Sequence, residues 1–148
     1  MARTALLDVN VLVALFFPEH VHHEVAHDWF ADNEHLGWAT CPLTQNGFVR
    51  VAAQLGSDNS PVRSETAARH LGRFCATGHH HFWSDAVSLL DPKLFRPEFV
   101  GGPRQLTDVY LLGLAKKMRG HLVTLDTSIE PRAVVGASSR HLTVVRPG

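Results

Sequence analysis

Short apolar runs alternate with longer segments of helical periodicity along this chain of 148 residues. The short runs are rich in Leu, Val and Thr, have the length of buried strands, and are bounded by polar or turn-forming residues. They predict β-strands at residues 4–7, 36–40, 80–83, 121–125 and 141–145, of which the run at 80–83 suits an edge strand.

Apolar positions three and four residues apart, with proline or glycine near the segment ends, predict the helices. We expect helices at residues 9–17, 21–31, from Pro42 onward, 61–75, 107–118 and 127–135, a turn at 56–60, and a long surface loop at 91–103. Strands that alternate with helices favour an α/β domain in which helices cover both faces of a largely parallel sheet.

Size and composition agree with one compact domain over residues 1–148, and 45% of the residues are apolar, which is enough for a core. The 14 basic and 14 acidic residues balance, so a phosphate-binding surface would have to be local. Cys41 and Cys75 are too few for a disulfide framework. The apolar N-terminal segment stops at Pro18 and suits neither a membrane span nor a signal peptide. We therefore expect a cytoplasmic protein.

Three aspartates occupy similar places in the predicted elements. Asp8 follows the first strand, Asp126 follows the fourth, and Asp108 lies at the start of the long helix. The carboxyl ends of parallel strands share one edge of a sheet, so we expect the three side chains to meet there. Taken singly, each aspartate is more typical of a helix cap than of a metal ligand. Taken together, close carboxylates repel by about 4 kcal/mol per pair at an effective dielectric constant of about 20, and Mg²⁺ or Mn²⁺ would neutralise them.

Four segments carry these acids or a related polar residue: LLDVN at 6–10, PLTQNGFVR at 42–50, LTDVYLLGLA at 106–115 and LVTLD at 122–126. In this order and spacing they resemble the motifs of PIN-domain ribonucleases, in particular the VapC toxins of type II toxin–antitoxin systems. The resemblance implies a PIN-like three-layer α/β/α fold with a central, mainly parallel sheet of four to five strands.

The same resemblance implies a metal-dependent endoribonuclease that cleaves structured RNA such as the loops of tRNA or rRNA. Asp8, Asp108 and Asp126 would hold one or two Mg²⁺ or Mn²⁺ ions, and Asn10 and Thr124 would orient ligands or phosphate by hydrogen bonds. The partners it implies are an RNA substrate, a cognate VapB-like antitoxin and a second copy of the chain in a homodimer.

One position departs from the family pattern. Gln45 stands where the family has a glutamate, its neighbour Asn46 is not acidic, and Ser128 stands where some relatives have a further aspartate. Glutamine offers a carbonyl oxygen but no charge, which predicts weaker metal affinity, with Gln45 as a weak outer ligand. Arg50 either contacts phosphate or pairs with the acidic residues; the sequence favours neither.

Two other functions stay open. A non-catalytic module could bind RNA or antitoxin through a site that Gln45 has weakened. A receiver-like phosphotransfer domain also places an aspartate after its first strand, but this chain lacks the matching lysine and central aspartate.

Histidines at positions 20, 23 and 27 have the spacing of one helical face. Such a face could bind zinc. No cysteine or fourth ligand accompanies the three side chains, and we interpret them as a solvated surface.

Overall fold

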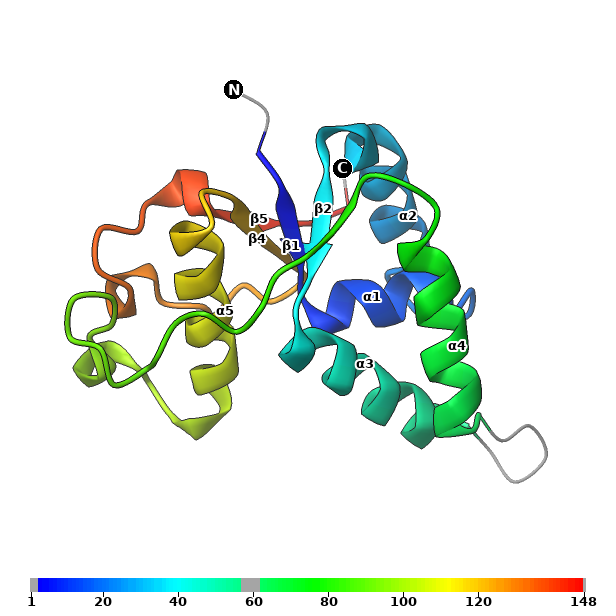
Figure 1. The fold of residues 1–148 in the computed structure, drawn as a ribbon, viewed down its shortest axis with the longest axis horizontal. Helices are drawn as coiled ribbons and strands as arrows, with labels where there is room; N and C mark the ends of the chain where they lie inside the picture. The colour runs from blue at the N-terminus through cyan, green and yellow to red at the C-terminus, as the bar shows by residue number, and fades with distance from the viewer. Residues whose placement is uncertain (1–2, 57–61, 148) are drawn as a thin grey trace.

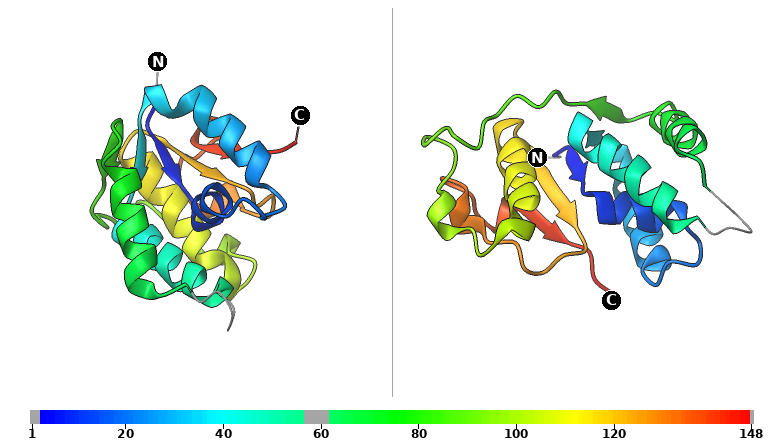
Figure 2. Two further views of the ribbon diagram at one scale, coloured as in Figure 1. Left: turned by 90° about the vertical axis from the view of Figure 1, so that its right-hand side faces the viewer. Right: turned by 90° about the horizontal axis from the view of Figure 1, so that it is seen from below.

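The computed structural model describes residues 3–56 and 62–147, in which a five-stranded sheet has helices on both faces (Figures 1 and 2). The strand order is β3-β2-β1-β4-β5, and every neighbouring pair is parallel. This confirms the predicted α/β architecture with its central parallel sheet. The strands are β1 (Ala5–Leu7), β2 (Trp38–Thr40), β3 (His80–Phe82), β4 (His121–Thr124) and β5 (Leu142–Val144).

The helices divide unequally between the two faces of the sheet. In Figure 1, α5 lies on one side of the strands, and α1 to α4 lie on the other. Among the described residues, none of these helices combines the length and apolar character that a membrane span requires. Their bounds are α1 (Val9–Phe16), α2 (His23–Asn33), α3 (Pro42–Leu55), α4 (Ser64–Cys75) and α5 (Leu106–Lys117).

Each face of the sheet has its own core because successive strand residues point to opposite sides. Leu6 of β1 and Leu122 of β4 pack with α5, whereas Leu7 and Val123, one position further along, pack with α1. All four side chains are fully buried. Strands β1 and β4 are therefore held from both sides, and their carboxyl ends form a rigid support for the residues that follow.

The segment predicted as a helix at 127–135 is not an α-helix, and this prediction was wrong. The backbone N–H and the hydroxyl of Ser128 both donate to Oδ1 of Asp126, at 2.8 and 2.7 Å, and form a turn directly after β4. Pro131 then disfavours helical backbone at the preceding residue, and Glu130 is extended with φ −97° and ψ 105°. One short 3₁₀ turn, Pro131–Ala133, remains.

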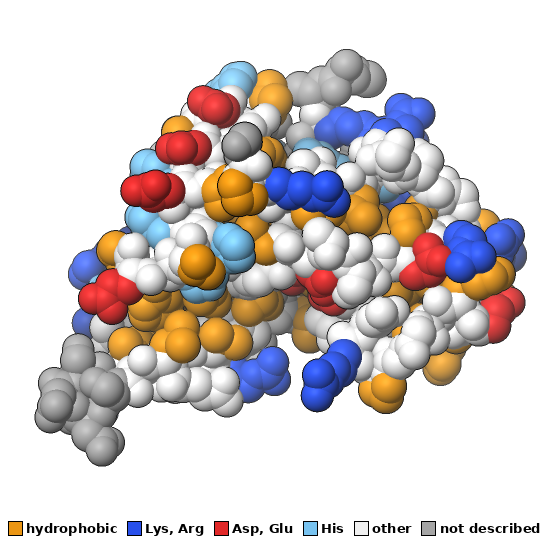
Figure 3. All heavy atoms as spheres, turned by 180° about the vertical axis from the view of Figure 1, so that it is seen from behind, with side chains coloured by type: hydrophobic (Ala, Val, Ile, Leu, Met, Phe, Trp, Pro, Cys, Tyr) orange, Lys and Arg blue, Asp and Glu red, His pale blue; other side chains and the backbone are white. Residues whose placement is uncertain are grey.

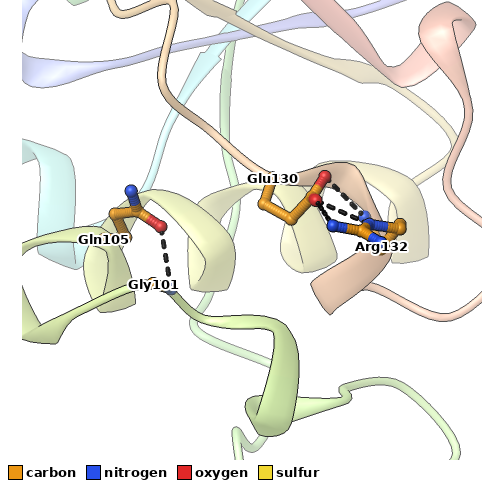
Figure 4. Close-up of polar contacts among 4 residues, drawn as sticks. All are labelled: Gly101, Gln105, Glu130 and Arg132. Carbon is orange, nitrogen blue, oxygen red and sulfur yellow. Dashed lines mark hydrogen bonds and ion pairs between the residues drawn. The ribbon is translucent and has the colours of Figure 1, made fainter.

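The predicted surface loop at 91–103 is partly buried. Phe95 is 2% exposed and forms an isolated antiparallel bridge with Val134. The guanidinium group of Arg132 lies 5.0 Å from the centre of the Phe99 ring and donates to Glu130 through Nε at 2.6 Å (Figure 4). The loop is thus fixed against the segment that follows β4, and Figure 4 also shows Gly101 donating to Gln105 just before α5.

Smaller differences concern the ends of elements. The helix predicted at 21–31 begins two residues later, at His23, and the strand predicted at 36–40 begins at Trp38. Most of the turn predicted at 56–60, and the first residue of the helix predicted at 61–75, lie outside the described residues.

Gly113 of α5 allows Phe95 to pack directly on the helix. A Cβ atom at Gly113 would lie 2.3 Å from Cζ of Phe95, which is inside any van der Waals contact. Gly113→Ala should displace this ring at a cost that exceeds the gain in helix propensity, so we expect the melting temperature to fall by roughly 5 °C. Thermal unfolding followed by circular dichroism measures this shift.

Gly72 of α4 provides the matched control, because a Cβ atom there would meet no heavy atom within 4 Å. Gly72→Ala should raise the melting temperature by roughly 3 °C through helix propensity alone. A rise in both variants would contradict the packing argument.

Candidate active site

Asp8 joins the ends of the two central strands. It follows β1 directly, and its Oδ1 accepts the backbone N–H of Val9 at 2.7 Å, which caps α1. Its Oδ2 accepts the hydroxyl proton of Thr124, at the end of β4, at 2.7 Å. The side chain is 5% exposed, and this burial raises its pKa above the ordinary aspartate value. Asp8 is therefore a helix cap and also part of a cluster formed between two strands.

Thr124 is the centre of this cluster. Its hydroxyl oxygen donates to Asp8 and accepts from the backbone N–H of Asp126 at 3.1 Å and from the Asn10 amide at 3.2 Å. Oδ1 of Asn10 in turn accepts the backbone N–H of Leu125 at 3.1 Å. Asn10 and Thr124, which the sequence nominated as orienting residues, thus hold Asp8 and Asp126 in fixed relative positions.

Asp108 lies in the first turn of α5 and faces the other two acids. Burial, the charges of Asp8 and Asp126, and a hydrogen bond with Asp126 together raise its pKa to about 7, and burial contributes most. The pKa of Asp126 is lowered, first by the hydrogen bonds from Ser128. Asp108 therefore carries the proton of this pair, and the three predicted aspartates interact at one edge of the sheet.

The three acids do not yet form a closed ligand set. Within residues 3–56 and 62–147, no three His, Cys, Asp or Glu side chains are close enough to hold a metal ion between them. A cation between them would offset their repulsion, because like charges about 4 Å apart cost several kcal/mol in a partly buried site. The donors are all carboxylate oxygens, which fits Mg²⁺ or Mn²⁺ better than zinc.

A cleft of about 340 Å³ opens beside these acids and is lined by Asp8, Asn10, Asp108 and His20, with three valines. Figure 3 shows acidic atoms within a hollow, with basic side chains on both sides of its opening. The polarity of the cleft suits an anionic chain that is bridged to acids by cations.

Helix α3 approaches this cleft closely with one face. A Cβ atom at Gly47 would lie 2.7 Å from Cγ2 of Val9, so the helix passes directly over the start of α1. Arg50 is three residues further on, is exposed, and forms no ion pair with any acid among the described residues. Of the two roles considered for Arg50, pairing with the acids does not occur in this structure.

Gln45 lies on the side of α3 opposite Gly47, because a step of two residues along a helix turns it by about 200°. Its amide Nε2 donates to Oγ1 of Thr40 at 3.0 Å, and the same oxygen is 2.8 Å from Nε2 of His80. Gln45 also lines a groove with residues of α4, among them Cys75. The structure does not bring Gln45 together with the three aspartates.

His20 is a lining residue that sequence reasoning did not nominate. It was grouped with His23 and His27 on one helical face, but α2 begins only at His23, and His20 lies in the turn before it. His23 contacts the carbonyl oxygen of Ala14 at 2.7 Å through Nδ1, and the His23 and His27 rings are 5.8 Å apart. In the sequence, Pro18 was the signal that the first helix ends and that a turn follows it at His20.

Similar proteins agree with this geometry. The chain is 46% identical over 141 residues to ribonuclease VapC44 of Mycobacterium tuberculosis, which covers 95% of this chain and 99% of that protein. It is 45% identical over 125 residues to ribonuclease VapC38 of the same organism, an alignment that covers 84% of this chain and 86% of that protein. It is 38% identical over 133 residues to ribonuclease VapC39, also of this organism, and that alignment covers 90% of this chain and 96% of that protein. No model of a known protein family matches the chain.

These alignments span 99%, 86% and 96% of the three relatives. With this level of identity added to the all-parallel sheet and its cluster of acids, the chain belongs to the VapC family of ribonucleases.

Proposed function

We propose that this protein is a metal-dependent endoribonuclease that cleaves structured RNA, such as the loops of tRNA or rRNA. The observation that carries the proposal is the cluster of Asp8, Asp108 and Asp126 at the edge of a cleft, where burial first and then the neighbouring acids raise the pKa of Asp108 to about 7. Such a cluster lowers the free energy of unfolding, and it offers a binding site for a divalent cation.

Asp8, Asp108 and Asp126 would hold the cation. When bound, it would lower the pKa of a water molecule and stabilise negative charge on the scissile phosphate. The protein contributes rigidity: Thr124 and the N–H of Val9 fix both oxygens of Asp8, at 2.7 Å each. These contacts leave the acids little freedom to turn away from a bound ion.

We propose that Arg50 binds the RNA backbone. It is exposed on the face of α3 that passes over α1, and no described acid pairs with it. A planar guanidinium group suits bidentate contact with phosphate. The cleft has a volume of only about 340 Å³, so we propose an unpaired loop rather than a duplex as the segment that enters it.

The proposed protein partners are a VapB-like antitoxin and a second copy of the chain. Apolar side chains that an antitoxin could cover line a hollow of about 250 Å³ between α1, α3 and α4, and they include Phe16, Phe17 and Phe48. Val21, next in sequence to His20, is 85% exposed.

A second candidate is a weakened module that binds RNA or antitoxin without cleaving. The absence of charge at Gln45 motivates it, since the family motif that residues 42–50 resemble has a glutamate there. The position of Gln45 on the far side of α3 argues for the nuclease instead, because the three aspartates do not depend on it.

Asp126→Asn tests the nuclease directly. Removal of one metal-binding charge should reduce cleavage of bulk tRNA or rRNA in Mn²⁺ by about 100-fold. The measurement is the initial rate of fragment formation on a denaturing gel, with EDTA as the metal-free reference. Asp32→Asn, at an exposed position on α2, is the matched control and should leave the rate unchanged. Equal rates in both variants would remove the proposal.

Asp108→Asn should stabilise the metal-free protein at high pH. The folded-state pKa of about 7 exceeds the ordinary value of 3.8, so the ionised form is disfavoured by folding, and stability is lost as the pH rises between these values. In EDTA at about pH 8, the variant should melt roughly 3 °C higher than the wild type, and at about pH 4 the two should coincide.

The same pair of proteins tests the cation. Mn²⁺ should raise the melting temperature of the wild type at neutral pH because it binds only the folded state, and the rise should be smaller in Asp108→Asn. A destabilised Asp108→Asn protein in EDTA at high pH would show that the carboxylate is a structural group instead.

Gln45→Glu should leave RNA cleavage within about twofold of the wild type, because the new carboxylate would face Thr40 rather than the metal site. Its charge should instead raise the pKa of His80, which shares the Thr40 hydroxyl. NMR titration of the imidazole reports this shift. A large gain in cleavage would show that the wild-type glutamine weakens the enzyme.

A further inference from the structure

We propose that His20 is an RNA-binding residue whose Nε2–H donates to a phosphate oxygen of the nucleotide next to the metal site. The inference rests on the proposed ribonuclease function. It names a contact that neither the acidic motifs nor the comparisons assign, and it follows from how the turn after α1 holds the imidazole ring.

The turn determines which nitrogen of His20 carries the proton. The backbone N–H of His22 donates to Nδ1 of His20 at 3.0 Å, so Nδ1 must be unprotonated while this bond exists. The neutral ring therefore carries its proton on Nε2. Two backbone bonds of 2.9 Å, from His20 to Phe17 and from His23 to His20, fix the position of the turn itself.

The ring is neutral at physiological pH for a second reason. Burial lowers the pKa of His20, and the neighbouring His22 and His23 lower it in the same direction. A neutral donor has an advantage here. A lysine or arginine at this position would pair with Asp8 or Asp108 and compete with the cation, whereas a neutral imidazole can donate to phosphate without occupying the acids.

His20 lies where such a contact is needed. It lines the same cleft as Asp8, Asn10 and Asp108, and Nδ1 is turned into the loop, so the opposite edge of the ring, with Nε2, is the part available to a ligand. The remaining lining residues are Val9, Val13 and Val51, which offer no donor. Among the side chains lining the cleft, His20 and Asn10 alone contribute N–H donors. Asn10 donates one of its two amide N–H groups to Thr124, and its Oδ1 accepts from Leu125, so its amide is held toward the end of β4.

Two substitutions separate RNA binding from support of the turn. His20→Asn keeps an acceptor near the position of Nδ1 and loses the distal donor. His20→Gln places an amide N–H near the position of Nε2 and loses the local acceptor. If His20 binds RNA, His20→Asn should weaken RNA binding and kcat/KM by about tenfold, and His20→Gln should recover most of this loss. If His20 only supports the turn, the order of the two variants is reversed.

The affinity is measured without cleavage, by fluorescence anisotropy of a labelled single-stranded RNA in an Asp108→Asn background. His35→Asn, at an exposed histidine that follows α2, is the matched control. Melting temperatures are recorded for each variant, since a structural role would appear there first. Wild-type affinity and wild-type kcat/KM in His20→Asn, or a greater loss in His20→Gln than in His20→Asn, would overturn the inference.

Failure of this inference is distinguishable from failure of the proposed function. If Asp126→Asn abolishes cleavage while His20→Asn behaves as the wild type, the nuclease stands and the His20 contact is wrong. If Asp126→Asn cleaves normally, the metal-dependent mechanism fails, and the His20 contact fails with it.

Discussion

The bond of 2.7 Å between Thr124 and Asp8 is the interaction on which the site depends. It links the carboxyl ends of β1 and β4 through a carboxylate that is 5% exposed. A buried carboxylate without partners would cost several kcal/mol, so Asp8 requires the hydroxyl as much as the N–H of Val9. The same hydroxyl receives the N–H of Asp126. One threonine thus sets the distance between two of the three acids.

Asp108, the third acid, is positioned by the apolar packing of its helix. Asp108 is on α5, which is held on the sheet by apolar residues such as Leu111 and Leu112 and by the close fit of Phe95 against Gly113. These contacts keep Asp108 near two other carboxylates although its charge is disfavoured there, as its pKa of about 7 indicates. Rigid packing thereby keeps Asp108 in a buried and acidic setting, whose free-energy cost a cation or a proton relieves.

The sequence predicted the parts of the site that follow from strand order. Asp8 comes directly after β1, and Asp126 lies two residues beyond the end of β4. Parallel strands end at one edge of the sheet, so the sequence alone was enough to predict that these two acids meet. It did not predict which way Gln45 points, because the phase of α3 is set by the contact of Gly47 with Val9, which is distant in sequence. The helix predicted at 127–135 was wrong for a related reason. Its apolar spacing favoured a helix, but Pro131 disfavours helical backbone at the residue before it.

The two faces of α3 explain how a motif can change at one position while the site persists. One face carries Gly47 and Arg50 past the start of α1, and the other directs Gln45 to Thr40. The Gln45 amide donates to the Thr40 hydroxyl, and the oxygen of that hydroxyl also lies 2.8 Å from Nε2 of His80. A carboxylate at this position would have no N–H to donate and would accept from Thr40 instead. The glutamine is therefore part of a structural hydrogen-bond group, and the negative charge beside the cleft comes from the aspartates.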